Sequence, residues 1–268
     1  MKPVNLNDYL NKNNPWSHRL LGNVDFQKTR DIDQIEREYN QDKYAKLAAF
    51  TLGTMEEYRN LELEQAGLPV ETARPIISIG DELYEVTVPE ARKMYYDLIR
   101  SNVNKYKAGR ICELGCGYGY NLTLFEGELY GGEYSSNAVS IAQRLAMDVI
   151  AFNYYHEKDY SFIRPDSTVF TSHSIEQIPD ASVIVENLRK VKHNIKYVVH
   201  IEPTILPERD SLLGLMRNRY MELNDYNRNL LSTLQQSADI EILEYQSDVF
   251  GVVPLNSSNV LVWKFTDS

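Results

Sequence analysis

Cysteine is scarce in this chain, and its scarcity excludes a disulfide framework and a cysteine-based zinc site as ways of stabilising the fold. Cys112 and Cys116 are the two cysteines among 268 residues. Two thiols cannot provide the disulfide framework of a small secreted fold. A C-x-x-x-C spacing without a second Cys or His pair nearby is not a zinc-binding pattern. Residues 1–16 are polar and lack the apolar centre of a signal peptide. We therefore expect structural thiols and a cytoplasmic location.

The sequence also lacks long apolar runs and an excess of basic residues. No run approaches the roughly 20 apolar residues that span a bilayer, so we expect no membrane partner. Lys and Arg number 28 against 38 Asp and Glu, which gives a formal net charge of -10. An acidic chain lacks the cationic surface that binds a phosphate backbone by releasing its counterions. The expected partner is therefore a small molecule and not a nucleic acid.

The overall composition is that of a globular chain, and tyrosine is its one markedly abundant residue type. Hydrophobic residues make up 43% and charged residues 25%, which fits one large domain or one domain with a smaller addition. Tyrosine occurs 19 times. Its apolar ring and polar hydroxyl suit a ligand cavity, although half-buried surface tyrosines would give the same count.

The first part of the chain predicts helices and loops. Residues 25–50 are charged, with apolar positions near helical spacing, and a second helix is expected over residues 55–65, before Gly67. Two β-rich runs flank Gly80 and Asp81 and predict a hairpin. Pro89 suits the first turn of the helix that follows.

From Arg110 onward the chain alternates between strand-like and helix-like runs. Such alternation predicts an α/β fold with a doubly wound, mostly parallel sheet and helices on both faces. Ser135 or Ser136 is expected to cap one helix, and residues 209–236 predict a long helical stretch. The last two strand-like runs, at residues 241–250 and 259–265, are expected to form an antiparallel edge pair.

A glycine-rich turn carries the main functional signal. Gly115, Gly117 and Gly119 follow a predicted strand, where glycine lets the backbone turn sharply and approach a ligand. A dinucleotide fingerprint would need its third glycine at Tyr120. Glu113, two residues before the first glycine, would repel a pyrophosphate and attract an ammonium group. The turn therefore favours a cationic ligand without phosphates.

A second acid strengthens this interpretation. Glu133 ends the next predicted strand, twenty residues after Glu113. An acid at that position can accept both hydrogen bonds of a ribose diol. The order of strand, glycine turn, helix, strand and acid is much more specific than a glycine run alone.

The sequence here resembles the class I S-adenosylmethionine-dependent methyltransferases. The matching segments are ELGCGYG, GGEYS, AFNYY and VFTSHSIEQIP, and the resemblance covers about residues 90–265. It implies a Rossmann-like, mostly parallel seven-stranded sheet with an antiparallel last strand. It also implies S-adenosyl-L-methionine as cofactor, with S-adenosyl-L-homocysteine as product. Residues 1–88 would form a mostly helical N-terminal cap that helps to bind substrate, and residues 89–268 the cofactor-binding domain.

The resemblance also implies roles for individual residues. The three glycines would line the methionine and ribose parts of the cofactor, and Glu133 would hold the ribose hydroxyls. Tyr134 would flank the adenine, and Asn153 would stand where the family usually has an Asp. Thr171 and Ser172 would lie against the methionine part. The family's usual acid at the start of the fourth strand is absent, although Asp166 is close.

Three residues at predicted strand ends are candidates for acid–base chemistry. His173 follows the fourth strand, and His200 and Glu202 close the fifth. Histidine titrates near neutral pH and could take a proton from an acceptor hydroxyl, although each could also be structural. Glu176 and Gln177 are expected to cap a helix or orient the acceptor. No i, i+4 pair supports a metal site, so no metal ligand is expected.

The predicted helix after the fifth strand carries Arg217, Arg219 and Tyr220. They could form one wall of the acceptor pocket and bind an anion. Charges on such a helix more often form a solvated face, and we favour that interpretation.

The sequence as a whole predicts an enzyme that transfers a methyl group to an oxygen or nitrogen of a small molecule, such as a natural product, a sugar or an amino-acid-like metabolite. The alternative keeps the cofactor but attacks its aminobutyryl carbon, in a cyclase or aminocarboxypropyl-type reaction that releases methylthioadenosine. A non-catalytic scaffold is disfavoured because it would not need the glycine turn and both acids. A nicotinamide-dependent oxidoreductase is disfavoured by Tyr120 and Glu113. A monomer or homodimer is expected.

Overall fold

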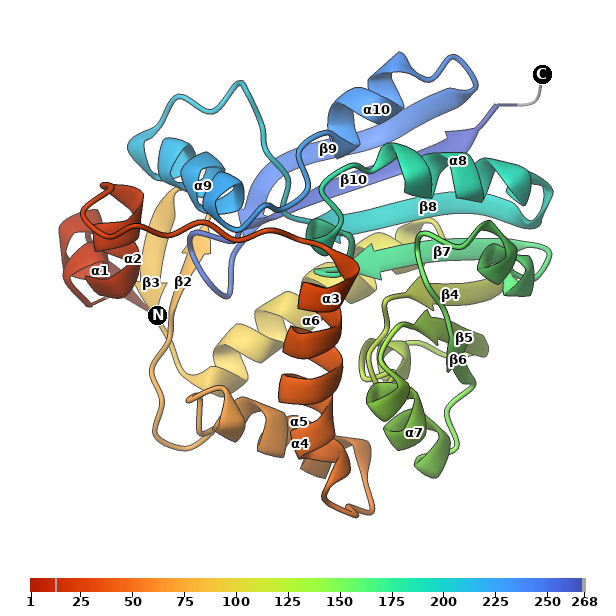
Figure 1. Cartoon of the computed structure of the whole chain (residues 1–268), viewed down its shortest axis with the longest axis horizontal. Coiled ribbons are helices and arrows are strands. Elements are labelled where there is room, and N and C mark those ends of the chain that lie inside the picture. Colours follow the sequence, from red (N-terminus) through yellow and green to blue (C-terminus); the bar gives the residue numbers. More distant parts are fainter. Residues whose placement is uncertain (13, 267–268) are drawn as a thin grey trace.

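The computed structural model describes residues 1–12 and 14–266 and contains two sheets (Figure 1). The larger sheet has seven strands in the order β6-β5-β4-β7-β8-β10-β9. Its strands are β4 (Arg110–Leu114), β5 (Glu128–Glu133), β6 (Val149–Ala151), β7 (Ser167–Ser172), β8 (Ile195–Glu202), β9 (Ile240–Phe250) and β10 (Ser258–Phe265). Strands β4 to β8 pair in parallel, whereas β10 runs antiparallel to both β8 and β9. The predicted sheet, with its antiparallel last strand, is confirmed.

Helices cover both faces of this sheet because its strands alternate apolar side chains between two cores. Ile111 and Phe170 belong to the core that includes α6 and α7, whereas Cys112 and Val169 belong to the core that includes α8 and α10. The helical elements from residue 88 onward are α6 (Val88–Lys105), η2 (Asn121–Leu124), α7 (Ser136–Arg144), η3 (Glu157–Phe162), η4 (Ile175–Gln177), α8 (Ser182–Lys190), η5 (Lys192–Asn194), α9 (Leu212–Leu223) and α10 (Leu230–Gln236).

The N-terminal region combines helices with a small sheet. Its elements are β1 (Lys2–Val4), α1 (Leu6–Lys12), α2 (Asn14–Leu20), α3 (Ile32–Ile35), η1 (Glu36–Tyr44), α4 (Ala45–Ala48), α5 (Met55–Gln65), β2 (Ile76–Ile79) and β3 (Glu82–Glu85). The predicted hairpin is confirmed, since β2 pairs with β3, and β1 adds a third strand that the sequence did not predict. Side chains from η1, α4 and α5 join the core on the α6 and α7 face.

Capping side chains mark the N-termini of three helices. Thr87 and Glu90 form a capping box at the start of α6, and Thr54 and Glu57 form another at α5. Ser135 caps α7 by accepting a hydrogen bond from the Ala138 N–H. The helix predicted over residues 55–65 is confirmed.

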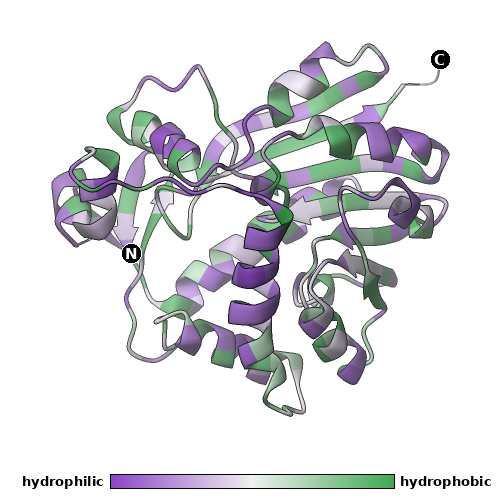
Figure 2. Cartoon of the chain, viewed as in Figure 1, coloured by the Kyte–Doolittle hydropathy of each residue, from purple (hydrophilic) through white to green (hydrophobic). Residues whose placement is uncertain are grey.

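Two predicted helices differ from those in the structure. The charged segment becomes helical only at Ile32, and its central nine residues form the π-helix η1; this segment is largely hydrophilic (Figure 2). The stretch at 209–236 is two helices. Between them, Asp225 adopts a left-handed backbone with φ of 54°, and the buried Asn227 side chain donates to the Ile178 carbonyl at 2.7 Å. Fixing the chain at these two residues interrupts the helix.

Candidate functional site

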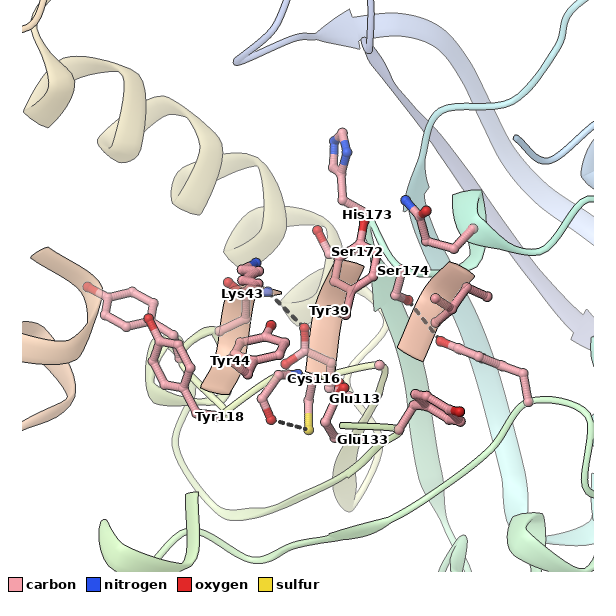
Figure 3. Close-up of a pocket in the computed structure, with 18 of the residues that line it drawn as sticks. Tyr39, Lys43, Tyr44, Glu113, Cys116, Tyr118, Glu133, Ser172, His173 and Ser174 are labelled. Atoms are coloured by element: carbon pink, nitrogen blue, oxygen red, sulfur yellow. Dashed lines mark hydrogen bonds between the residues drawn. The ribbon is translucent and has the colours of Figure 1, made fainter. Parts of the chain in front are cut away.

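A cavity of about 290 Å³ opens at the carboxyl ends of β4, β5 and β7. This is where ligands bind in doubly wound sheets, and the volume is close to the lower end of the range for ligand pockets. Eight of the twelve predicted site residues line it: Glu113, Gly115, Gly117, Glu133, Tyr134, Asn153, Ser172 and His173. Figure 3 shows several of these side chains together.

The glycine turn has a backbone that other residues would not tolerate. Gly115 and Gly117 have φ values of 71° and 56°, in the left-handed region that favours glycine. A Cβ on Gly115 would lie 2.4 Å from the Ser174 Cβ, and one on Gly117 would lie 2.5 Å from the Tyr44 hydroxyl oxygen. The turn therefore brings bare backbone to the cavity.

Glu133 ties the glycine turn to the next helix. Its Oε2 accepts a hydrogen bond from the Gly117 N–H at 2.8 Å, and its Oε1 accepts one from the Ser135 N–H at 2.8 Å. Burial raises the pKa of this carboxyl, although the backbone donors act in the opposite direction. Carboxylate oxygens can accept more than one hydrogen bond, so Glu133 can hold the turn and also meet a ligand.

Glu113 has an acceptor atom without a partner. Its Oε1 accepts from the Asn121 side chain at 2.7 Å, whereas its buried Oε2 has no hydrogen-bond partner among the described residues. Burial raises the pKa of the carboxyl well above its usual range. A buried acceptor of this kind at a cavity is suited to a positively charged donor from a ligand.

Asn153 and Ser172 are already engaged within the protein. Asn153 Oδ1 accepts from the Tyr155 N–H at 2.9 Å, so its amide nitrogen is the group that can donate to a ligand. The Ser172 hydroxyl lies 2.6 Å from the Tyr95 hydroxyl. Tyr95 comes from α6 and itself lines the cavity.

Four predicted site residues do not line the cavity: Gly119, Thr171, His200 and Glu202. His200 is 1% exposed, its Nδ1 lies 2.9 Å from the Thr171 hydroxyl, and burial lowers its pKa to about 3. A proton-transfer role for His200 therefore lacks the access to substrate that such a role needs. The sequence places His200 near a strand end, but the side chain projects to the face that carries Trp263, 6.1 Å away between ring centroids.

Glu202 holds the loop after β7. It accepts hydrogen bonds from the backbone N–H groups of Ser174, Ile175 and Glu176, at 3.0 to 3.3 Å. Burial, followed by the charge of Glu176, raises the pKa of its carboxyl to about 7. The geometry gives Glu202 a positioning role and no direct access to the cavity.

His173 does reach the cavity, in a strained conformation. Its φ is 50°, unusual for a residue with a side chain. Nδ1 lies 3.1 Å from Glu176 Oε2, and Nε2 lies 2.7 Å from the Ser258 hydroxyl. Burial would lower the pKa of His173, but the Glu176 carboxylate outweighs burial and raises it.

The N-terminal region provides the opposite wall; the sequence predicted a cap there but did not identify the residues of this wall. Tyr39, Lys43 and Tyr44 come from η1, and Arg59 and Glu62 come from α5. Glu62 accepts from Lys43 at 2.8 Å and Arg59 at 2.7 Å. Figure 3 shows Tyr39, Lys43 and Tyr44 beside Glu113, Cys116 and Glu133. The abundance of tyrosine was the only available signal, and eight tyrosines line the cavity: Tyr39, Tyr44, Tyr95, Tyr118, Tyr120, Tyr134, Tyr154 and Tyr155.

The arginines of α9 lie elsewhere. Arg217 is fully buried and pairs with Asp81 at 2.8 Å and Asp248 at 3.2 Å, so it neither lines the cavity nor faces solvent. Arg219 pairs with Glu222 on an exposed face, as expected. Within residues 1–12 and 14–266, no group of three His, Cys, Asp or Glu side chains is arranged to hold a metal ion.

The sequence matches no protein-family model and no curated protein. The structure is similar to that of magnesium protoporphyrin IX methyltransferase (ChlM) from Synechocystis PCC 6803 with bound SAH, at 11% identity and a TM-score of 0.53, over 88% of this chain and 100% of that one. It is also similar to the [4+2]-cyclase SpnF, at 13% identity and a TM-score of 0.53, over 91% and 98% of the two chains.

This chain has the class I S-adenosylmethionine-dependent methyltransferase fold. The fold that the sequence motifs implied is therefore confirmed. No helix among the described residues combines the length and apolar character needed to cross a membrane.

Proposed function

We propose that the chain is an S-adenosylmethionine-dependent methyltransferase that acts on an oxygen or nitrogen of a small molecule. One arrangement carries this proposal. Glu113, with its unpartnered Oε2, the bare turn at Gly115 and Gly117, and Glu133 border a single cavity at the ends of adjacent parallel strands. These groups complement an ammonium, a close-packed nucleoside and a ribose diol.

The residues present fit this cofactor. Glu113 would meet its ammonium group, and Glu133 its ribose hydroxyls. Tyr134 and Asn153 would border the adenine, and Ser172 would lie near the methionine part. S-adenosylmethionine, when bound, supplies a methyl group already activated on a sulfonium. The protein therefore mainly needs to hold the acceptor in line and exclude water.

His173 is the predicted proton acceptor that the geometry still supports. It lines the cavity, and its Nδ1 faces the Glu176 carboxylate. A raised pKa suits a group that must take up a proton near neutral pH. A base is required only for an acceptor that must lose a proton, such as a hydroxyl.

Calorimetry with S-adenosylhomocysteine tests the cofactor assignment directly. We expect saturable binding that is lost on substitution of Gly117. Absence of binding to the wild-type protein would contradict the proposal. The small-molecule class is supported by the net charge of -10, which disfavours a nucleic-acid acceptor. The cytoplasmic location and the monomer or homodimer state remain predictions that fractionation and light scattering can test.

The alternative reaction uses the same cofactor but attacks its aminobutyryl carbon. One of the two similar structures is named as a cyclase, so the fold is compatible with reactions other than methyl transfer. Product analysis separates the two possibilities. S-adenosylhomocysteine among the products supports methyl transfer, and methylthioadenosine supports the alternative.

A further inference from the structure

A buried polar group lies beside the cavity, between the loop after β7 and the turn before β10. We call it the Glu176 cluster and define it as His173, Glu176, Gln177, Asn256 and Ser258. Glu176 is 5% exposed. Its Oε1 accepts from Gln177 Nε2 at 2.7 Å, and its Oε2 accepts from Asn256 Nδ2 at 3.0 Å and faces His173 Nδ1 at 3.1 Å.

Glu176 is held as a carboxylate in a buried place. Burial alone would raise the pKa of Glu176, but the charge of His173 and the hydrogen bonds from His173, Asn256 and Gln177 outweigh it and lower the pKa. The carboxylate is therefore ionised at neutral pH. When His173 is neutral, the cluster carries the single negative charge of Glu176, which repels an anionic ligand and attracts a cation.

Two acceptor atoms of the cluster have no partner. Because both amide nitrogens donate to Glu176, the oxygens of the two amides point elsewhere. Gln177 Oε1 and Asn256 Oδ1 are buried and make no hydrogen bond among the described residues. Unpaired buried acceptors are rare because they lose their hydrogen bonds to water. Gln177 and His173 line the cavity, whereas Glu176, Asn256 and Ser258 are not among its lining residues. A ligand donor would therefore approach the cluster through Gln177, whose side chain is 5% exposed.

Aromatic rings complete this end of the cavity. Tyr39 and Tyr95 both line it, and the Tyr95 ring packs edge-on against His173 with centroids 5.8 Å apart. The pKa of Tyr39 is raised by burial, then by Tyr226 and by the charge of Glu176, which places Tyr39 within the field of the carboxylate. A carboxylate together with tyrosine rings is a combination that binds organic ammonium groups.

We propose that the Glu176 cluster is the acceptor subsite of this enzyme and that it binds a protonated amine on the substrate. The ammonium N–H groups would donate to Gln177 Oε1, and the charge would be balanced by Glu176. This inference rests on the proposed function, because it assumes that the cofactor fills the side of the cavity at Glu113 and Glu133. An ammonium that keeps its proton is not a nucleophile, so the bound amine anchors the substrate and a different atom receives the methyl group.

Matched amines and alcohols test the subsite in protein saturated with S-adenosylhomocysteine. The probes are butylamine with butanol, phenethylamine with phenethyl alcohol, and putrescine with butanediol, titrated by ligand-observed NMR. We expect at least one amine to bind about tenfold more tightly than its alcohol. Glu176→Gln should remove that preference, and Gln177→Met should weaken the amine several-fold. Glu64→Gln, which removes an exposed acid, should leave the preference intact.

The outcomes separate this inference from the proposed function. Failure of the wild-type protein to bind S-adenosylhomocysteine would overturn the proposed function, and the inference with it. Normal cofactor binding with no preferred amine in the millimolar range would overturn the inference alone. A preference that survives in folded Glu176→Gln protein would do the same. The inference would also be overturned if magnesium bound at a site that requires Glu176 and prevented the amine from binding.

Discussion

The two walls of the cavity are built in different ways. The sheet wall consists of the turn at Gly115 and Gly117 together with Glu113 and Glu133, and the Gly117 N–H donates a hydrogen bond to Glu133. The cap wall consists of side chains from η1 and α5, namely Tyr39, Lys43, Tyr44, Arg59 and Glu62. Within it, Lys43 and Arg59 form ion pairs with Glu62. Figure 3 shows members of both walls facing one space.

This difference indicates how each wall should respond to change. A side chain on Gly115 or Gly117 would begin within 2.5 Å of a neighbouring side chain and would enter the cavity, so substitutions in the sheet wall should act mainly on ligand affinity. An ion-pair network can be altered one side chain at a time, but removing one partner leaves a charge buried without its counterpart. Substitutions in the cap wall should therefore act mainly on stability.

Gly117→Arg should have the largest effect on binding. The new Cβ would lie 2.5 Å from the Tyr44 hydroxyl at a φ of 56°, and the guanidinium would fill the space for the cofactor. We expect affinity for S-adenosylhomocysteine to fall by at least roughly a hundredfold, measured by calorimetry. Gly67→Arg is the matched control, because Gly67 has a φ of 75° and nothing within 4 Å of its Cβ position. Equal affinities in the two variants would remove the sheet wall from the proposed site.

Glu133→Ala should have the next largest effect. The substitution removes the acceptor of the Gly117 and Ser135 N–H groups and the proposed partner of the ribose. We expect affinity for S-adenosylhomocysteine to fall by roughly tenfold to a hundredfold. Calorimetry combined with a thermal melt distinguishes lost contacts from a general loss of folding. Unchanged affinity in a folded variant would contradict the assignment of Glu133.

The same contrast explains what the sequence could predict. Glu113, the glycines and Glu133 form a short-range pattern tied to the ends of adjacent strands, and the chain order alone brings them together. The cap wall has no such pattern. Tyr44 precedes Gly117 by more than seventy residues, and the π-helical winding that positions it leaves no recognisable spacing.

His200 shows a second limit of sequence reasoning. Its place near the end of β8 was predicted correctly, yet a strand end does not determine which neighbouring groups a side chain meets. His200 pairs in register with Leu261 and packs on Trp263, away from the cavity. His173 reaches the cavity because it lies one residue beyond β7 and has a left-handed backbone, which no periodicity predicts.

Glu62→Gln should test the cap wall through stability. It removes the partner of Lys43 and Arg59 and a carboxylate acceptor of the Tyr118 hydroxyl. We expect a loss of about 3 kcal/mol in the free energy of unfolding, measured by urea denaturation at neutral pH. Affinity for S-adenosylhomocysteine should change less than in Glu133→Ala. Glu64→Gln, an exposed acid on the same helix, is the control and should be nearly neutral.

The pH dependence of Glu62→Gln provides an independent check. Burial would raise the pKa of Glu62, but Lys43 and Arg59 outweigh burial and hold it far below its ordinary value of 4.5. A lowered pKa contributes stability that is present above the ordinary value and is lost as the pH falls through the lowered pKa. The wild-type protein should therefore lose more stability on acidification below about 4.5 than the variant. Parallel pH profiles would show that the Glu62 network does not stabilise the cap.

Glu113 offers the smallest and most specific effect, the release of a proton on ligand binding. Burial raises the pKa of its carboxyl well above the usual range, so the carboxyl keeps its proton at higher pH than an exposed glutamate when no ligand is bound. A ligand ammonium placed at the unpartnered Oε2 would favour the ionised form and expel that proton. Calorimetry of S-adenosylhomocysteine in buffers of different ionisation enthalpy should detect the release of up to about one proton per site.

The release should decrease as the pH rises, vanish in Glu113→Gln and persist in Glu126→Gln, which changes an exposed acid. Binding without proton release at every pH would mean that the ammonium of the ligand lies elsewhere, and the role proposed for the acid before the glycine turn would be wrong.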